Sequence, residues 1–432
     1  MFNNVNSISA FKNSVFEFYK ILYKVIEQSV PKVLPKKSFC QIWYTSELKA
    51  LKNKKNKAYK KYKQYNSISD LSMYTKLRYD FNILNNICYN DYICTIKNNI
   101  KNNSSHFFKF VNTKRKTSEY PLTFKYNDVV SENDDITANL FSNFFSSTYL
   151  DNIFDDSNSY PYDIVSVDII PPSVDEIVVL KYLKSMKFCT KPGPDKIPSC
   201  LLKECSETLY VPLAKLFSLS QKLSFVPDIW KSSYIIPLYK SGSRNEVSNY
   251  RGIAKLNDIP KLFEHIIADQ LSFSLKNVFS TFQHGFVRNR STVTNLLEFT
   301  CEIFQSFQNR LQTDVVYTDF SKAFDIVNHS LLLKKLELIG FPPSLKDWVS
   351  SYLSNRTQHV LFRNCISKPI SVLSGVPQGS HLGPLLFNLF INDLPSVIRH
   401  ASILMYADDV KLFLSVSNVL DYSYLQYDIN NV

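Results

Sequence analysis

Glycine is scarce in this 432-residue chain, which has eight glycines and none before Gly193. In so glycine-poor a sequence, each glycine is expected at a bend, or where another backbone approaches too closely for a Cβ atom. Three of them, Gly375, Gly379 and Gly383, fall within nine residues. This clustering predicts a functional loop near the C-terminal end of the sequence.

The chain also lacks the signals of several protein classes. Its eight cysteines include no Cys-x-x-Cys pair and no histidine partners at zinc-finger spacing, so free thiols are expected. The N-terminus has neither the basic start nor the apolar core of a signal peptide. No stretch approaches the roughly 20 apolar residues of a membrane span. We expect an intracellular chain without a membrane partner, in the cytoplasm or the nucleus; its oligomeric state is left open.

Acidic residues are outnumbered by basic ones, with 38 Asp and Glu against 50 Lys and Arg, a formal net charge of +12. A balance of this sign favours a polyanionic partner, nucleic acid first and a membrane surface second. The hydrophobic content of 45% is that of a globular protein, and the length allows two or three domains.

Three regions of the sequence differ in composition and in predicted secondary structure. Residues 1–120 are predicted to be helical and basic. Their run KALKNKKNKAYKKYKQY, residues 49–65, holds eight lysines and no acid. Two explanations of this run stay open. It is either a solvated helix face or a surface that contacts the nucleic-acid backbone. Residues 121–170 are predicted as a connector around one amphipathic helix, and residues 171–432 as a mixed α+β domain. Within that domain, Ser173 and Ser291 are predicted to cap helices.

Three aspartates stand at predicted strand ends between apolar residues. Residues 311–318 predict a strand that ends at Asp319, with a helix beginning there. In MYADDVKLF, residues 405–413, Asp408 and Asp409 are predicted at the bend of a hairpin. Taken singly, these residues also fit a helix cap or an exposed turn. Two metal ions held by shared carboxylates would relieve their repulsion, activate an attacking hydroxyl and stabilise a departing phosphate.

Two further segments have the composition of ligand-binding loops. The stretch SGVPQGSHLGPLLFNLFINDL, residues 374–394, predicts a rigid loop with Gln378 at its tip, followed by a helix. A predicted hairpin carries Lys240 and Arg251, which suit a triphosphate because phosphate oxygens accept several charge-assisted hydrogen bonds. An ordinary loop and a solvated hairpin are the alternatives.

An ordered series of motifs extends over residues 191–413: GPDKIPSCLLK, IIPLYK, NYRGIAKL, QHGF, YTDFSKAFDIVNH, SYLSNRTQHV, SGVPQGSHLGPLLFNLFINDLP and YADD. Together they resemble the reverse transcriptase of non-LTR (LINE) retrotransposons, most closely the jockey-like elements. The resemblance implies a right-hand polymerase fold with fingers and palm, preceded by a mostly helical linker. It also implies an RNA-directed DNA polymerase that adds dNTPs to a primer 3′-hydroxyl, with an RNA template and a DNA primer or target.

The resemblance implies roles for single residues. Asp319, Asp408 and Asp409 match the family's catalytic aspartates. Asp319, Asp408 and the backbone carbonyl of Phe320 would hold two Mg²⁺ ions, with Mn²⁺ as a possible substitute, and Asp409 would support them. Phe324 matches the ring that excludes a 2′-hydroxyl from the incoming sugar.

The remaining matched positions concern the nucleotide. Gln378 and Gly379 match the loop against the incoming nucleotide and template, and Lys240 and Arg251 match the residues that hold the triphosphate. Many relatives have proline where this chain has Gly252, from which we expect a looser strand.

The ends of the sequence also depart from the family. Only 23 residues follow Asp409, so a missing thumb is expected, and no upstream endonuclease is recognisable. Two other interpretations stay open. One is an inactive remnant that only binds nucleic acid. The other is a different palm-fold polymerase such as a viral RNA polymerase, which generally needs a polar group near Phe324 to recognise a ribose hydroxyl.

Overall fold

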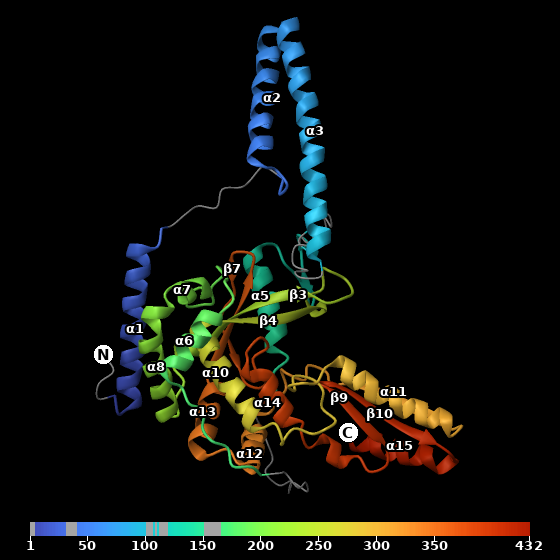
Figure 1. The fold of residues 1–432 in the computed structure, drawn as a ribbon. Coiled ribbons are helices and arrows are strands. Elements are labelled where there is room, and N and C mark those ends of the chain that lie inside the picture. The colour runs from blue at the N-terminus through green and yellow to red at the C-terminus, as the bar shows by residue number, and fades with distance from the viewer. Residues whose placement is uncertain (1–4, 32–40, 101–106, 109, 112–119, 151–165) are drawn as a thin grey trace. The chain divides into compact units, whose positions relative to one another are not determined.

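The computed structural model describes residues 5–31, 41–100, 107–108, 110–111, 120–150 and 166–432 (Figure 1). The chain divides into two compact units, Met1–Lys24 with Pro121–Val432, and Val25–Tyr120. The beginning of helix α1 (Ile8–Ser29) thus groups with the larger unit, whereas the sequence pattern groups residues 1–120 together. The assignment of residues 1–120, 121–170 and 171–432 to separate domains stays a prediction.

The smaller unit contains a helical hairpin of α2 (Ser46–Tyr65) and α3 (Ile68–Asn99). The side chain of Thr45 caps α2 by accepting a hydrogen bond from the N–H of Leu48, 3.2 Å away. An apolar seam joins the helices. Its buried members are Leu48, Phe81 and Cys88, with Trp43, Tyr44, Leu51 and Leu84 packed against them. Since this seam uses the apolar side chains, most lysines of α2 are left at the surface.

Two sheets organise the larger unit. The first has the strand order β4-β3-β6-β7, with β8 also paired to β6, and the second has the order β5-β10-β9. The strands of the first sheet are β3 (Ser232–Tyr239), β4 (Tyr250–Leu256), β6 (Arg356–Phe362), β7 (Cys365–Ile366) and β8 (Ile370–Val372). Those of the second are β5 (Gln312–Asp319), β9 (Ser402–Tyr406) and β10 (Asp409–Val416). This is a mixed α+β architecture, as the sequence predicts.

Helices surround both sheets (Figure 1). Besides those named elsewhere, they are α7 (Ser199–Glu204), α8 (Ser206–Lys222), α9 (Asp228–Lys231), α10 (Asp258–Ser274), α12 (His329–Ile339), α13 (Pro343–Leu353), α14 (Leu382–Phe390) and α15 (Val419–Asn431). Aromatic rings fill the space between several of them. Phe217 of α8 stacks on Phe263 of α10 with ring centroids 4.4 Å apart, and Trp348 of α13 meets Phe263 edge-on. Helices α8, α10 and α13 therefore pack into one aromatic core.

The segment predicted as a connector contributes to this core. It holds the short hairpin β1 (Lys125–Tyr126) and β2 (Val129–Val130), and helix α5 (Asp134–Ser146). Phe141 of α5 is fully buried and contacts the rings of Phe124, Tyr250 and Phe362, which ties α5 to the first sheet. The rest of the connector, residues 151–165, lies outside the described residues.

Two predicted helix caps have different outcomes. Ser291 caps α11 (Thr292–Gln308) in a reciprocal arrangement with Thr294, as predicted. The prediction for Ser173 is wrong: α6 (Glu176–Ser185) is capped by Asp175, whose carboxylate accepts from the N–H of Val178 at 2.8 Å. The backbone of Ser173 is instead bonded to the side chain of Gln270. Asp and Ser are almost equally good caps, so their order along the chain could not decide between them.

The expectations of free thiols and of no membrane span can be compared with the described residues only. The cysteines among them are free thiols, at positions 88, 94, 189, 200, 205, 301 and 365. Of the helices that the structure describes, none is both long and apolar enough to cross a membrane.

The packing of α1 leads to a testable difference between two phenylalanines. Phe11 is fully buried and meets the ring of Phe225 edge-on, whereas Phe16 of the same helix is 65% exposed. We expect Phe11→Ala to lower the free energy of unfolding by about 3–5 kcal/mol, because it leaves a cavity. Phe16→Ala should change it by less than about 0.5 kcal/mol. Urea denaturation of both variants measures the difference; equal effects would contradict the grouping of α1 with the larger unit.

Candidate active site

Strand pairing brings the separated aspartates to one place. β5 runs antiparallel to β10, and its register pairs Asp319 with Asp409. Directly opposed residues of an antiparallel pair have Cα atoms about 4.5–5.5 Å apart. The strand follows from its composition, because Val315 and Val316 suit a pleated surface and pair with Phe413 and Leu412. Residues about 90 positions apart in the sequence are thus neighbours.

The third aspartate sits in the turn between β9 and β10. Tyr406 pairs with Asp409, which leaves Ala407 and Asp408 as the two turn residues. Ala407 has a φ of +55°, in the left-handed region that alanine rarely adopts. The predicted hairpin bend is therefore present, and its tip places Asp408 beside the pair of Asp319 and Asp409.

The predicted helix start at Asp319 is wrong. The strand ends there, but turns follow, and α12 begins only at His329. Its cap is Asn328, whose side chain accepts from the N–H of Leu331 at 2.9 Å. Asp319 is therefore not a helix cap, and its exposed carboxylate has no capping bond that would explain its position.

Electrostatic repulsion is built into this group. Partial burial raises the pKa of Asp409, and the charges of Asp408 and Asp319 raise it further. The two neighbouring carboxylates therefore disfavour the ionised form of Asp409. A divalent cation among the carboxylates would reverse the sign of this interaction.

The protein supplies only some of the ligands that such a cation needs. Within the described ranges, no group of three His, Cys, Asp or Glu side chains is arranged to hold a metal ion. The predicted ligands are two carboxylates, from Asp319 and Asp408, and the backbone carbonyl of Phe320. That set suits Mg²⁺, which is often bound through one or two carboxylates together with substrate phosphates and water. The remaining ligands would come with the substrate.

Phe324 is held rigidly at the end of the turns after β5. Its ring is 9% exposed and stacks on Phe387 of α14 at a centroid distance of 4.3 Å. Phe286 meets the same ring edge-on at 6.3 Å. The carbonyl of Phe324 accepts a hydrogen bond from the N–H of Val376, 2.7 Å away, in the glycine-rich loop. Ring and loop are thus fixed to each other.

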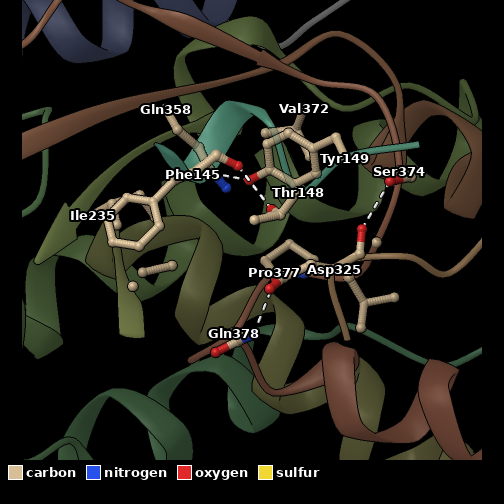
Figure 2. A pocket seen from close by; sticks show the side chains of 14 residues that line it. Phe145, Thr148, Tyr149, Ile235, Asp325, Gln358, Val372, Ser374, Pro377 and Gln378 are labelled. Atoms are coloured by element: carbon tan, nitrogen blue, oxygen red, sulfur yellow. Dashed lines mark hydrogen bonds between the residues drawn. The ribbon is translucent and has the colours of Figure 1, made fainter. Parts of the chain in front are cut away.

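The tip of that loop joins the first sheet to Asp325. Gln378 donates from its Nε2 to Asp325 Oδ1 at 3.0 Å, and its Oε1 accepts from Arg251 Nε at 3.2 Å. Figure 2 shows Gln378 and Asp325 with this hydrogen bond. Burial raises the pKa of Asp325, while Gln378 and the charges of Arg251 and Lys322 oppose the rise. Arg251, Gln378 and Asp325 form one polar chain.

Asp325 is a residue that the sequence analysis missed. Its signal was an acid between the apolar residues Phe324 and Ile326, the same pattern that drew attention to Asp319. The cavity it borders measures only about 40 Å³ and is also lined by Gly252 and by Tyr149, which Figure 2 labels. This volume is too small for a nucleotide, which would have to lie outside it.

The backbone around Gln378 is closely packed against β4. Its carbonyl accepts from the N–H of Ala254 at 3.0 Å. Gly379 has a φ of +107°, and a Cβ atom there would lie 2.7 Å from the carbonyl oxygen of Ala254. Glycine is therefore required at this position on both counts. Gly252 pairs with Pro237 in the ladder of β3 and β4, and the expected looseness of this strand stays a prediction.

Lys240 and Arg251 lie on the β3–β4 hairpin, as predicted. Arg251 pairs with Leu238, and Lys240 follows two residues after Leu238, so the alternation of side chains places both cations on one face. Both are exposed, as are the apolar side chains of Ile236 and Ile253 on that face. The structure links Arg251 to Gln378; for Lys240 it shows only a backbone bond from its N–H to the carbonyl of Asn249.

Comparison with known proteins agrees with this arrangement. Residues 238–424 match the family described as reverse transcriptase (RNA-dependent DNA polymerase). A probable RNA-directed DNA polymerase from transposon BS of Drosophila melanogaster is 31% identical over 304 residues, which are 66% of this chain and 33% of that protein. The RNA-directed DNA polymerase from mobile element jockey of the same species is 30% identical over 240 residues, 53% of this chain and 26% of that protein. Residues 238–424 include the three aspartates together with Lys240, Arg251, Phe324 and Gln378.

Residues 238–424, somewhat less than half of the chain, thus resemble the reverse transcriptase family. The relatives that resemble the chain include RNA-directed DNA polymerases of the non-LTR retrotransposons BS, jockey and X-element. The chain spans about a third or less of the length of these relatives.

Proposed function

We propose that this chain is an RNA-directed DNA polymerase that extends a primer on an RNA template. The observation that carries the proposal is the register of β5 and β10, which sets Asp319 across from Asp409 and beside Asp408. In the reaction, the primer 3′-hydroxyl attacks the α-phosphate of a dNTP and releases pyrophosphate. Two Mg²⁺ ions would lower the charge on the reacting phosphate and favour the ionised hydroxyl.

Each residue of the cluster has a proposed part in this reaction. Asp319, Asp408 and the carbonyl of Phe320 would hold the ions, and Asp409 would support them through its charge. The raised pKa of Asp409 fits a supporting role, because a nearby carboxylate that protonates more readily binds a cation less tightly. The second sheet would then form the palm, and the first sheet with its hairpin the fingers.

The nucleotide would be held between the hairpin and the glycine-rich loop. Lys240 and Arg251 offer two cations on one exposed face for the triphosphate. Gln378 and Gly379 present the loop tip next to Arg251. Asp325 would keep Gln378 in place through its hydrogen bond.

Phe324 would select the sugar. A ring that is packed on Phe387 and touched by Phe286 cannot turn aside for an added hydroxyl. Such rigidity is what discrimination by steric exclusion requires. This supports a preference for dNTPs over rNTPs, and argues against a viral RNA polymerase.

Replacing this ring should relax the choice of sugar. We expect Phe324→Ala to lower the preference for dNTP over rNTP by about tenfold or more, the size of effect that single pocket contacts produce. Primer extension with each nucleotide type in parallel measures the ratio, and dNTP incorporation by the same variant serves as the control. An unchanged ratio would contradict the role of Phe324.

A matched pair of aspartates on β5 tests the catalytic proposal itself. Asp319→Asn should reduce primer extension on RNA by at least about 100-fold, since it removes a metal ligand worth several kcal/mol. Asp314→Asn changes an acid of the same strand that pairs with Leu414, away from the turn, and should stay near wild type. If the wild type and Asp319→Asn extend no primer but bind RNA equally, the alternative of a binding protein without catalysis is correct.

The lysines of α2 support a further contact with RNA. Lys54, Lys57 and Lys60 are exposed on a helix whose apolar side faces α3. Lysine at such a surface binds phosphate without regard to sequence. The same surface would serve either interpretation of the protein, polymerase or binding remnant.

Neutralising these lysines should weaken RNA binding in a salt-dependent way. We expect the triple change of Lys54, Lys57 and Lys60 to Gln to reduce the slope of log affinity against log salt by about 2, at roughly 0.7 for each lost phosphate contact. The control is the same triple change at the exposed lysines 181, 222 and 276. Equal slopes for both triple variants, measured by fluorescence anisotropy, would show that α2 is only a solvated surface.

A further inference from the structure

Residues 282–285, which overlap the QHGF motif at residues 283–286, form an added edge along β9. The N–H of Met405 donates to the carbonyl of Phe282 at 2.9 Å, and the N–H of His284 donates to the carbonyl of Met405 at 2.9 Å. These bonds make a parallel bridge between Gln283 and Met405. The segment therefore lies next to the strand that leads into the turn with Asp408.

Gln283 binds that turn through its side chain. The side chain is almost fully buried. Its Oε1 accepts from the N–H of Ala407 at 2.9 Å and from the N–H of Gly285 at 2.8 Å, and its Nε2 donates to the carbonyl of Ala407 at 3.4 Å. Both backbone polar groups of Ala407 are thus held by one amide. Ala407 is the residue immediately before Asp408.

The conformation that this amide holds is an uncommon one. Ala407 has a φ of +55°, which an alanine adopts only where its surroundings enforce it. Gly285 adds to the constraint, because a Cβ atom at that position would lie 2.2 Å from the backbone nitrogen of Ala407. Asn388 of α14 fixes Gly285 in turn, since its Nδ2 donates to the carbonyl of Gly285 at 2.8 Å. The turn is enclosed by contacts that leave it one arrangement.

We propose that Gln283 is a positioning residue of the polymerase centre, which holds the Ala407–Asp408 turn so that the Asp408 carboxylate meets a divalent cation together with Asp319. The inference rests on the proposed function. It assigns to the QHGF segment a task that is separate from any contact with substrate. Residues that orient a metal ligand commonly change metal affinity by 10–100-fold when they are replaced.

The test measures metal binding directly, without catalysis. Binding of Mn²⁺ to the full chain is followed by electron paramagnetic resonance of the free ion. Gln283→Met removes the amide while keeping the length of the side chain, and should weaken Mn²⁺ binding about tenfold. Gln270→Met is the matched control, because Gln270 likewise binds the backbone N–H and carbonyl of one residue, Ser173, at 2.8 and 2.7 Å. It should bind Mn²⁺ as the wild type does.

Further variants distinguish failure of the positioning role of Gln283 from failure of the proposed metal site. Gln283→Glu keeps the acceptor for both N–H groups but loses the Nε2 donor to the Ala407 carbonyl. It should bind Mn²⁺ more weakly than the wild type and more tightly than Gln283→Met, and its comparison with the wild type stands even where Gln283→Met does not fold. Normal binding by Gln283→Met or by Gln283→Glu, or equal weakening by Gln270→Met, would each overturn the positioning role. If Asp319→Asn also leaves Mn²⁺ binding unchanged, the proposed metal site fails, and this inference fails with it.

Discussion

The antiparallel pairing of β5 with β10 is the interaction on which the candidate site depends. The ladder runs from Asp319 opposite Asp409 to Gln312 opposite Val416, so eight residue pairs fix one register. A slip by one residue would turn every side chain to the other face and separate the aspartates. The buried side chains of Val410 and Leu412 oppose such a slip, because it would expose them. Apolar packing thus determines where the charges lie.

This placement raises the energy of the folded chain at the point where function is proposed. Three carboxylates share one end of a sheet, and the turn that carries Asp408 also contains an alanine in the left-handed region. Strain and repulsion of this kind persist only where neighbouring structure determines the conformation. Here the neighbouring structure is the segment with Gln283 and Gly285, which contacts Ala407 directly before Asp408.

Much of the fold could be predicted from local sequence. The strand at 312–319 follows from its β-branched residues, and the cap at Ser291 from a local rule that needs no tertiary information. The three aspartates stood out for a similarly local reason, since they interrupt apolar runs. The roles of these residues came from the family resemblance, and what the structure adds is their adjacency.

What the sequence could not predict depends on contacts between distant residues. The polar chain from Arg251 through Gln378 to Asp325 joins three segments, and the apolar neighbours of Asp325 in the sequence do not show that Gln378 is its partner. The packing of α1 and α5 into the larger unit is of the same kind, because a helix pattern shows an apolar face without showing its partner.

The scarcity of glycine connects the local sequence with the contacts between distant residues. A chain with eight glycines in 432 residues places several of them, among them Gly285 and Gly379, where a Cβ atom would strike the backbone of another segment. Gly285 approaches Ala407 in the turn of Asp408, and Gly379 approaches Ala254 of β4, the strand that also carries Arg251. The two contacts therefore bracket the proposed site, one at the metal-binding end and one at the nucleotide-binding end. Close backbone approach at both ends is a requirement that any substitution at these glycines would violate, whatever the side chain.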